Sequence, residues 1–162
     1  MVRRFIQQVE IRLRQPQARM VWVGDGPSAR QLGRDHHDHH FAGVRLGEDL
    51  ASHYASADLF LFPSLTETYG NVVAEAMASG LPVMAYRSAA AAELIVQQQN
   101  GMVASPGDER GYVEGALWLL EESARLNDMA LAARQSMLPR SWGGVVETFE
   151  AVAREAIDSQ VR

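Results

Sequence analysis

Short, continuously apolar segments alternate along this chain with segments of helical periodicity, and this alternation restricts the fold more than any other feature. The clearest apolar segments are residues 20–24, 58–62 and 82–86, with weaker candidates at 39–44 and 101–104. Strands that are apolar at every position, rather than at alternate positions, are typical of a parallel sheet covered on both faces. The sequence therefore predicts an α/β fold: a doubly wound parallel sheet with helices on both faces.

Helical patterns fill the intervals between the predicted strands. A first helix should place Phe5, Val9 and Leu13 on one face, and another should place Leu50, Tyr54 and Ala57 before the second strand. Further helices are predicted over residues 28–33, 71–79, 90–98, 108–122 and, as an apolar stripe near the C-terminus, 145–157. The helix over 71–79 should stop at Gly80, because a glycine followed by a proline two residues later is a helix-stop signal.

Composition excludes several classes of function. A length of 162 residues suits one domain, and a net charge of −5 argues against a nucleic-acid-binding protein. No apolar run approaches the roughly 20 residues of a membrane-spanning helix. The chain has no cysteine, which is typical of a cytoplasmic protein and excludes thiolate chemistry. All fifteen basic residues are arginine, so a Walker A lysine and a lysine Schiff base are impossible.

Two glutamates mark the most informative loop, which follows the strand predicted at 58–62. Glu67 precedes the point at which the loop becomes a helix, and Glu75 lies about one turn inside that helix. The run 72–78 is otherwise apolar, so we expect a buried helix in which the Glu75 carboxylate must be paired or hydrogen-bonded. Since ligands of doubly wound sheets bind beyond the carboxyl ends of the strands, the geometry suits a ligand with hydroxyls and a phosphate.

Each of these features also has a purely structural interpretation. Glu67 could be an acid that interacts with a helix dipole, and Glu75 could pair with an arginine in the core. Gly24 and Gly26 could simply form a tight turn, which their short spacing favours over a phosphate contact. The run His36–His40 could hold a metal, but a polar loop is favoured, because neighbouring histidines of an extended segment point to opposite faces.

Residues 62–83 resemble the Glu-x7-Glu motif of the family-4 retaining glycosyltransferases. Other landmarks of that family's C-terminal domain follow in order over about residues 18–158: 23–27, 41–43, Leu50, Tyr54, 57–58, 100–101, 106–108 and 141–142. The resemblance implies the GT-B fold, which has two Rossmann-like domains with the active site between them. It also implies that this chain is a single donor-binding domain, with a core over 1–140 and a C-terminal crossover helix over 141–162.

The resemblance assigns roles to individual residues. Glu75 would bind the ribose hydroxyls of a nucleotide-sugar donor, and Glu67 would be the catalytic residue that orients the donor sugar and stabilises charge. Four backbone amides would approach the sugar and the diphosphate: those of Tyr69, Gly70, Asn71 and Val72.

Four further residues are implied to line the donor site from the neighbouring strands. Val44 and Arg45 would contact the base, and Gly24 and Gly26 would line the cleft between the two domains. No metal ion and no resident cofactor are expected, and the substrate would be a GDP- or UDP-linked sugar. Tyr86 and the alanine-rich stretch 88–93 are similar to the mannosyltransferase branch that uses GDP-mannose.

The sequence also departs from that family. The family's C-terminal domain opens with a strand that carries an arginine and, soon after it, a lysine, and neither that strand nor any lysine is present here. The N-terminal acceptor domain is missing as well. We therefore expect a fragment that does not transfer sugar alone, with self-association through an exposed C-terminal helix.

The implied function is transfer of a hexose, such as mannose, from a nucleoside diphosphate to an acceptor hydroxyl with retention of configuration. We expect a cytoplasmic location, compatible with the intact enzyme lying peripheral to a membrane. Two alternatives remain open at this point: half of a GT-B nucleotide-sugar epimerase, and a non-catalytic Rossmann-like interaction module.

Overall fold

A computed structural model describes residues 2–65, 71–140, 143, 150–152 and 154, with the side chains of residues 2–6 left out. The described residues form five strands: β1 (Val21–Val23), β2 (His40–Gly43), β3 (Phe60–Phe62), β4 (Val83–Tyr86) and β5 (Gly101–Ala104). The helices are α1 (Val2–Arg14), α2 (Ala29–Asp35), α3 (Gly47–Ala55), α4 (Asn71–Ala78), α5 (Ala89–Leu94), α6 (Glu109–Leu120) and α7 (Ser123–Met137), followed by a 3-10 turn, η1 (Leu138–Arg140).

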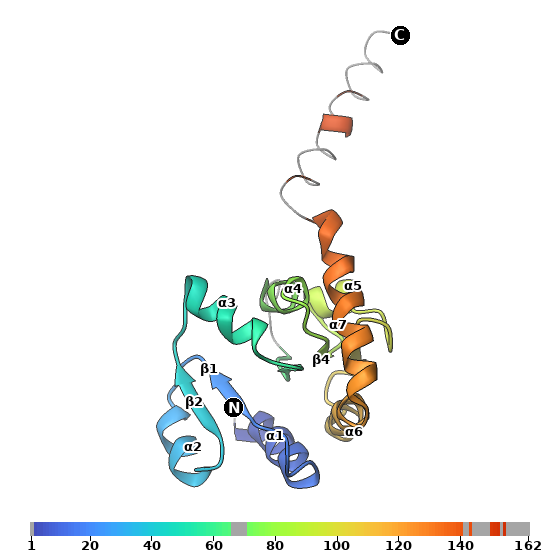
Figure 1. Cartoon of the computed structure of the whole chain (residues 1–162). Helices are drawn as coiled ribbons and strands as arrows, with labels where there is room; N and C mark the ends of the chain where they lie inside the picture. The colour runs from blue at the N-terminus through green and yellow to red at the C-terminus, as the bar shows by residue number, and fades with distance from the viewer. Residues whose placement is uncertain (1, 66–70, 141–142, 144–149, 153, 155–162) are drawn as a thin grey trace.

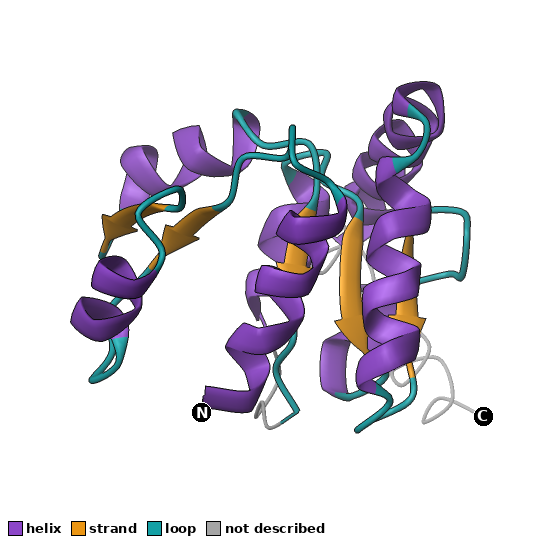
Figure 2. Cartoon of the chain, turned by 90° about the horizontal axis from the view of Figure 1, so that it is seen from below, coloured by secondary structure: helices purple, strands orange, loops and turns teal. Residues whose placement is uncertain are grey.

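All the described strands pair in parallel, which confirms the α/β class, but they fall into two sheets rather than one. β1 pairs with β2, and β3, β4 and β5 form a second sheet in that order (Figures 1 and 2). The usual doubly wound order is 3-2-1-4-5-6, with the first strand in the middle. The described residues supply no strand between β1 and β3, which is where that first strand would pair.

The core lies on both faces of β4, whose four residues are all buried. One face packs against α1 and α6 through Ile11, Met84, Tyr86, Ala104, Tyr112 and Ala116. The other face packs against α4, α5 and α7 through Val73, Ala76, Met77, Val83, Ala85, Leu94 and Ala133. β1 differs from β4, because the side chains of Val21 and Val23 are 54 % and 42 % exposed. Burial on both faces, predicted for every strand, is therefore reached in β4, whereas β3 is half-buried and β1 is largely exposed.

α1 turns a different face to the core from the one predicted. Leu13 is 74 % exposed, whereas Gln7, Gln8 and Ile11 are buried. The Gln7 amide nitrogen donates a hydrogen bond to the Tyr86 hydroxyl over 2.6 Å, and this contact helps to hold the polar residues against β4. Apolar periodicity alone could not identify this face, because the buried contact is partly made by amide side chains.

The C-terminal third also departs from expectation. α7 was not predicted, because its apolar residues form no clear stripe: Leu126, Met129 and Ala133 are buried, whereas Leu131 is 59 % exposed. α5 ends at Leu94 rather than near Gln98, and the chain then turns into β5. Most of the predicted stripe over 145–157 lies outside the described residues. Within the part of the chain that is described, no helix combines the length and apolarity needed to cross a membrane.

Candidate functional site

The described part of α4 runs from Asn71 to Ala78, within the predicted helix, and residues 66–70, which precede it, lie outside the described residues. Its buried residues are Val73, Ala76 and Met77, while Glu75 is exposed together with Asn71. The expectation of a buried Glu75 was therefore wrong. Ala74 and Ala78 read as apolar in the sequence, but alanine is small enough to lie at a surface, so the helix is amphipathic. Asn71 and Glu75 are four positions apart and share its exposed face.

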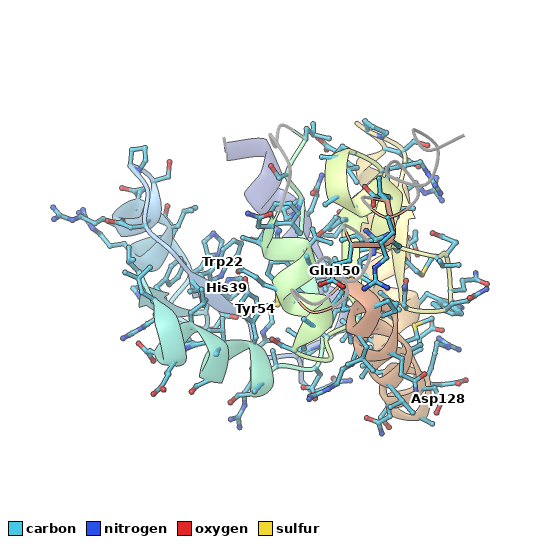
Figure 3. The ribbon with its side chains drawn as sticks, turned by 90° about the horizontal axis from the view of Figure 1, so that it is seen from above. Trp22, His39, Tyr54, Asp128 and Glu150 are labelled. Atoms are coloured by element: carbon cyan, nitrogen blue, oxygen red, sulfur yellow. The ribbon has the colours of Figure 1, made fainter. Side chains whose placement is uncertain are left out.

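The Glu75 carboxylate has a partner that was not assigned to the site from sequence. The Tyr54 hydroxyl, in the last turn of α3, donates a hydrogen bond to Glu75 Oε2 over 3.4 Å. Burial of the ring, with the nearby Glu75 charge, raises the pKa of Tyr54 to about 12, so the phenol stays protonated at neutral pH. In space, α3 extends from the end of β2 toward α4, and the Tyr54 side chain lies between α3 and α4 (Figures 1 and 3). In the sequence, Tyr54 was a landmark of the family resemblance and part of a predicted helix, and neither feature assigned it a role in the site.

Gly24 and Gly26 form the turn that follows β1. Gly24 has a φ of +119°, a conformation that favours glycine, and its N–H donates to the Gly43 carbonyl over 2.8 Å. The Gly26 N–H bonds the Asp25 carboxylate over 2.7 Å, and the Gly26 carbonyl accepts from Ala29 at the start of α2. The tight-turn interpretation is confirmed. Residues 25–27 and Arg30 also line a shallow, open depression on this surface.

Val44 and Arg45 follow β2 directly, beside this turn. The Val44 side chain is 61 % exposed and available to a ligand. The Arg45 guanidinium forms an ion pair with Asp49 of α3 over 3.1 Å, and its buried Nε atom has no hydrogen-bond acceptor in the described part of the chain. Arg45 is thus held by the first turn of α3, and any base contact from its side chain competes with Asp49.

The histidine run 36–40 forms the turn between α2 and β2. His39 is buried, and its Nδ1 accepts a hydrogen bond from the Trp22 indole over 3.0 Å. Burial lowers the pKa of His39. Among the residues that the structure describes, no group of three or more histidine or acidic side chains converges as metal ligands do.

The predicted site residues thus lie in two groups. Gly24, Gly26, Val44 and Arg45 lie at the carboxyl ends of β1 and β2, and Asn71, Val72 and Glu75 lie on the first two turns of α4. Tyr54 belongs to the helix that joins the groups. The roles implied for Glu67, Tyr69 and Gly70 concern residues outside the described part of the chain. The same holds for Trp142 and for most of the apolar stripe predicted over 145–157.

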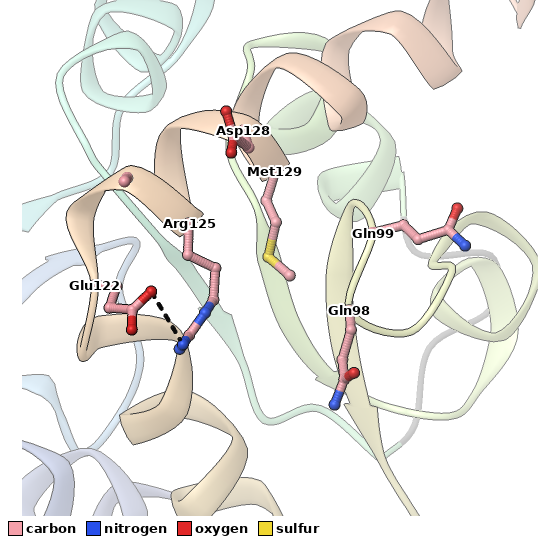
Figure 4. Close-up of a pocket in the computed structure, with 7 residues that line it drawn as sticks. Gln98, Gln99, Glu122, Arg125, Asp128 and Met129 are labelled. Carbon is pink, nitrogen blue, oxygen red and sulfur yellow. Dashed lines mark ion pairs between the residues drawn. The ribbon is translucent and has the colours of Figure 1, made fainter.

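A second depression lies at the opposite end of the larger sheet. It is lined by Gln98, Gln99, Glu122, Ala124, Arg125, Asp128 and Met129, from the turn before β5 and the start of α7 (Figure 4). The predicted ligand position is at the carboxyl ends of the strands, whereas this depression adjoins the amino end of β5. It contributes nothing to the candidate site.

Known proteins share the fold of this chain. The chain is 39 % identical over 139 residues to a GDP-mannose-dependent alpha-mannosyltransferase of Mycobacterium tuberculosis, covering 83 % of this chain and 36 % of that protein. Its fold matches the C-terminal domain of LpcC, a glycosyl transferase group 1 family protein of Francisella tularensis, with a TM-score of 0.72 and 21 % identity over 84 % of this chain and 76 % of that one. It also matches Anabaena HepE in complex with UDP and glucose, with a TM-score of 0.66 and 26 % identity over 89 % of this chain and 41 % of HepE.

The coverage of the relatives limits what is shown. The chain spans between 26 % and 36 % of the length of the first three curated relatives it matches, so their activities belong to longer proteins. The family model for glycosyl transferases group 1 matches residues 1–122, which include every described residue of the candidate site. The chain therefore belongs to the glycosyl transferases group 1 family.

Proposed function

We propose that this chain carries the nucleotide-sugar donor site of a retaining hexosyltransferase. The observation that carries the proposal is the surface of α4. Its exposed face carries Asn71 and, about one turn further on, the carboxylate of Glu75. We infer that backbone N–H groups at the N-terminal end of this helix meet the diphosphate. A helix N-terminus favours an anion such as a diphosphate, and an ionised carboxylate accepts hydrogen bonds from ribose hydroxyls.

The spacing of these groups suits a nucleoside diphosphate. Asn71 and Glu75 are about one helical turn apart, roughly 6 Å along the axis. This is the scale of the separation between a ribose and the phosphates attached to it. Val44 and Arg45 would contact the base from the end of β2, and Gly24 would face the cleft from the end of β1.

Mannose carried by GDP is the donor that the relatives favour. Two curated mannosyltransferases that are 36 % and 39 % identical to this chain are named as GDP-mannose-dependent. HepE is described with UDP and glucose, so UDP-glucose is the competing donor. The transferase interpretation is also better supported than the epimerase half or the non-catalytic module, because the family model and the curated relatives concern transferases.

The complete reaction needs parts beyond the described site. We infer that Glu67 orients the donor sugar and that an acceptor domain holds the acceptor, whose hydroxyl attacks on the same face as the departing diphosphate. The protein would use no resident cofactor. The absence of cysteine supports a reducing, cytoplasmic location.

Titration of the purified chain with GDP and with UDP, followed by calorimetry, tests the proposal. GDP should bind more tightly than UDP, and Glu75→Gln should weaken GDP binding about tenfold or more, since hydrogen bonds to a charged acceptor are lost. The matched control is Glu109→Gln, which changes an exposed glutamate at the start of α6 and should leave binding unchanged.

Two results would correct or contradict the proposal. Tighter binding of UDP than of GDP would keep the site and replace the base. Absence of binding by both nucleotides, or equal binding by the wild type and Glu75→Gln, would contradict a donor site on α4.

A further inference from the structure

Packing fixes the position of the Tyr54 ring. It makes a T-shaped contact with Phe60 in β3, with ring centroids 5.7 Å apart and planes at 80°, and Phe60 in turn stacks on Phe62. Tyr54 also packs against the apolar cluster beneath α4. Because the ring has apolar neighbours on the sheet side, the polar end of the side chain is directed to α4.

The hydroxyl reaches one oxygen of Glu75. It donates to Oε2 over 3.4 Å, and none of the described residues forms a hydrogen bond with Oε1. A glutamate on an exposed helix face ordinarily samples several rotamers. A fixed donor on one oxygen reduces that freedom and leaves the second oxygen to accept a hydrogen bond from a ligand.

The neighbouring charges suit this arrangement. Tyr54 remains a neutral donor far above physiological pH, because burial and the adjacent carboxylate both oppose loss of its proton. A protonated phenol can donate to a carboxylate oxygen without adding a charge to the site. Among the described residues, no arginine forms an ion pair with Glu75. The Tyr54 hydroxyl is therefore the side chain that contacts its carboxylate.

We propose that Tyr54 is a positioning residue: it holds Glu75 Oε2 so that Oε1 is presented to the 2′ and 3′ hydroxyls of the donor ribose. The inference rests on the proposed function and adds the residue that sets its selectivity for a ribose. Tyr54 itself does not touch the nucleotide. Its effect should therefore appear only with ligands that carry the hydroxyls read by Glu75.

Comparison of GDP with 2′,3′-dideoxy-GDP isolates this effect. The wild-type chain should prefer GDP, Glu75→Gln should lose most of the preference, and Tyr54→Phe should lose about three- to tenfold of it, since a long hydrogen bond contributes modestly. Binding of the dideoxy nucleotide should be the same for the wild type and Tyr54→Phe. In the double variant, Tyr54→Phe should have no further effect.

Tyr86→Phe is the matched control. It removes a phenol hydroxyl that accepts from Gln7 on the other face of the sheet, so it reproduces a loss of stability without touching Glu75. It should keep the full preference for GDP. Phenylalanine retains the ring at position 54, so the packing against Phe60 survives in the test variant.

The outcomes separate this inference from the function on which it rests. No preference for GDP in the wild type would contradict the proposed function. A preference that Glu75→Gln abolishes and Tyr54→Phe leaves intact would overturn the positioning role alone. The contact has an independent readout: Glu75→Gln should lower the Tyr54 pKa in an absorbance or NMR titration, and an unchanged pKa would also overturn the inference.

Discussion

The Trp22 indole donates a hydrogen bond to His39 Nδ1 over 3.0 Å, and the two ring planes are within 14° of each other. Trp22 lies in β1, and His39 immediately precedes β2. The bond requires an unprotonated Nδ1 and links the two strands of the smaller sheet. The charge state of one histidine therefore bears on the stability of that sheet.

Acid should destabilise the fold through His39. Burial is the main cause that lowers its pKa, and His36 and Arg12 act in the same direction, while Asp38 opposes them. The unfolded chain binds the proton at the ordinary pKa of 6.5, whereas the folded chain binds it only at lower pH. The stabilisation is thus complete above pH 6.5 and decreases as the pH falls below it.

Urea unfolding at about pH 7.5 and about pH 5.5 measures this dependence. His39→Asn keeps an acceptor near the Nδ1 position but does not titrate, so its unfolding free energy should fall less with acid than that of the wild type. The exposed His37→Asn is the control and should keep the wild-type dependence. Equal pH dependence in the wild type and His39→Asn would exclude His39 as the source.

A second prediction concerns Gln8, whose side chain is 2 % exposed and whose amide oxygen has no hydrogen-bond partner among the described residues. A buried, unsatisfied carbonyl costs about 1–3 kcal/mol relative to a solvated one. Gln8→Met, which has a similar shape and no such oxygen, should therefore raise the free energy of unfolding by about 1 kcal/mol. The exposed Gln17→Met should leave it nearly unchanged. Destabilisation by Gln8→Met would show that the amide contributes a favourable contact.

Prediction from sequence worked where one physical cause dominates. β4 and β5 have the expected positions because each short apolar run is bounded by turn or helix-stop signals, such as Gly80 and Pro82 before β4 and Asn100 before β5. α4 ends at Ala78, just before Gly80 with its φ of +81°, so this boundary is set by local backbone chemistry. Gly24 and Arg45 lie in the loops that follow β1 and β2, because those two strands end close to the predicted positions.

Prediction from sequence failed where contacts between distant parts of the chain determine which face of a helix is buried. The buried face of α1 is chosen by Gln7 and Ile11 against Tyr86, which an apolar pattern cannot reveal. Glu75 is exposed because α4 covers the sheet with one face only. The contact between Tyr54 and Glu75 joins residues 21 positions apart, from helices whose proximity depends on the fold.

Alanine substitution of two glycines should change the free energy of unfolding by very different amounts. A Cβ on Gly101 would lie 2.5 Å from the Val83 carbonyl oxygen of the neighbouring strand, so Gly101→Ala should lower the free energy of unfolding by about 2 kcal/mol. Gly26 has open space around it and no positive φ, so Gly26→Ala should change stability by less than about 1 kcal/mol. Thermal and urea unfolding of both variants check the contrast. Equal stability of the two would mean that β4 and β5 can separate at little cost.

The last prediction concerns Arg125, which joins the end of α6 to the start of α7. Its guanidinium carbon lies 3.8 Å from the centre of the Trp118 ring, its Nη1 donates to the Trp118 carbonyl, and Nη2 forms an ion pair with Glu122 over 3.3 Å (Figure 4). A planar fork can make these contacts together, whereas the compact ammonium of lysine cannot.

Arg125→Lys should therefore lower the free energy of unfolding by about 1 kcal/mol, although the charge is conserved. Arg134→Lys changes an exposed arginine of the same helix and should have an effect below about 0.5 kcal/mol. Urea unfolding followed by tryptophan fluorescence measures both, and the signal of Trp118 should change on loss of the stacked cation. Because all fifteen basic residues of this chain are arginine, equal effects of the two substitutions would show that its arginines act here as simple charges rather than through their planar geometry.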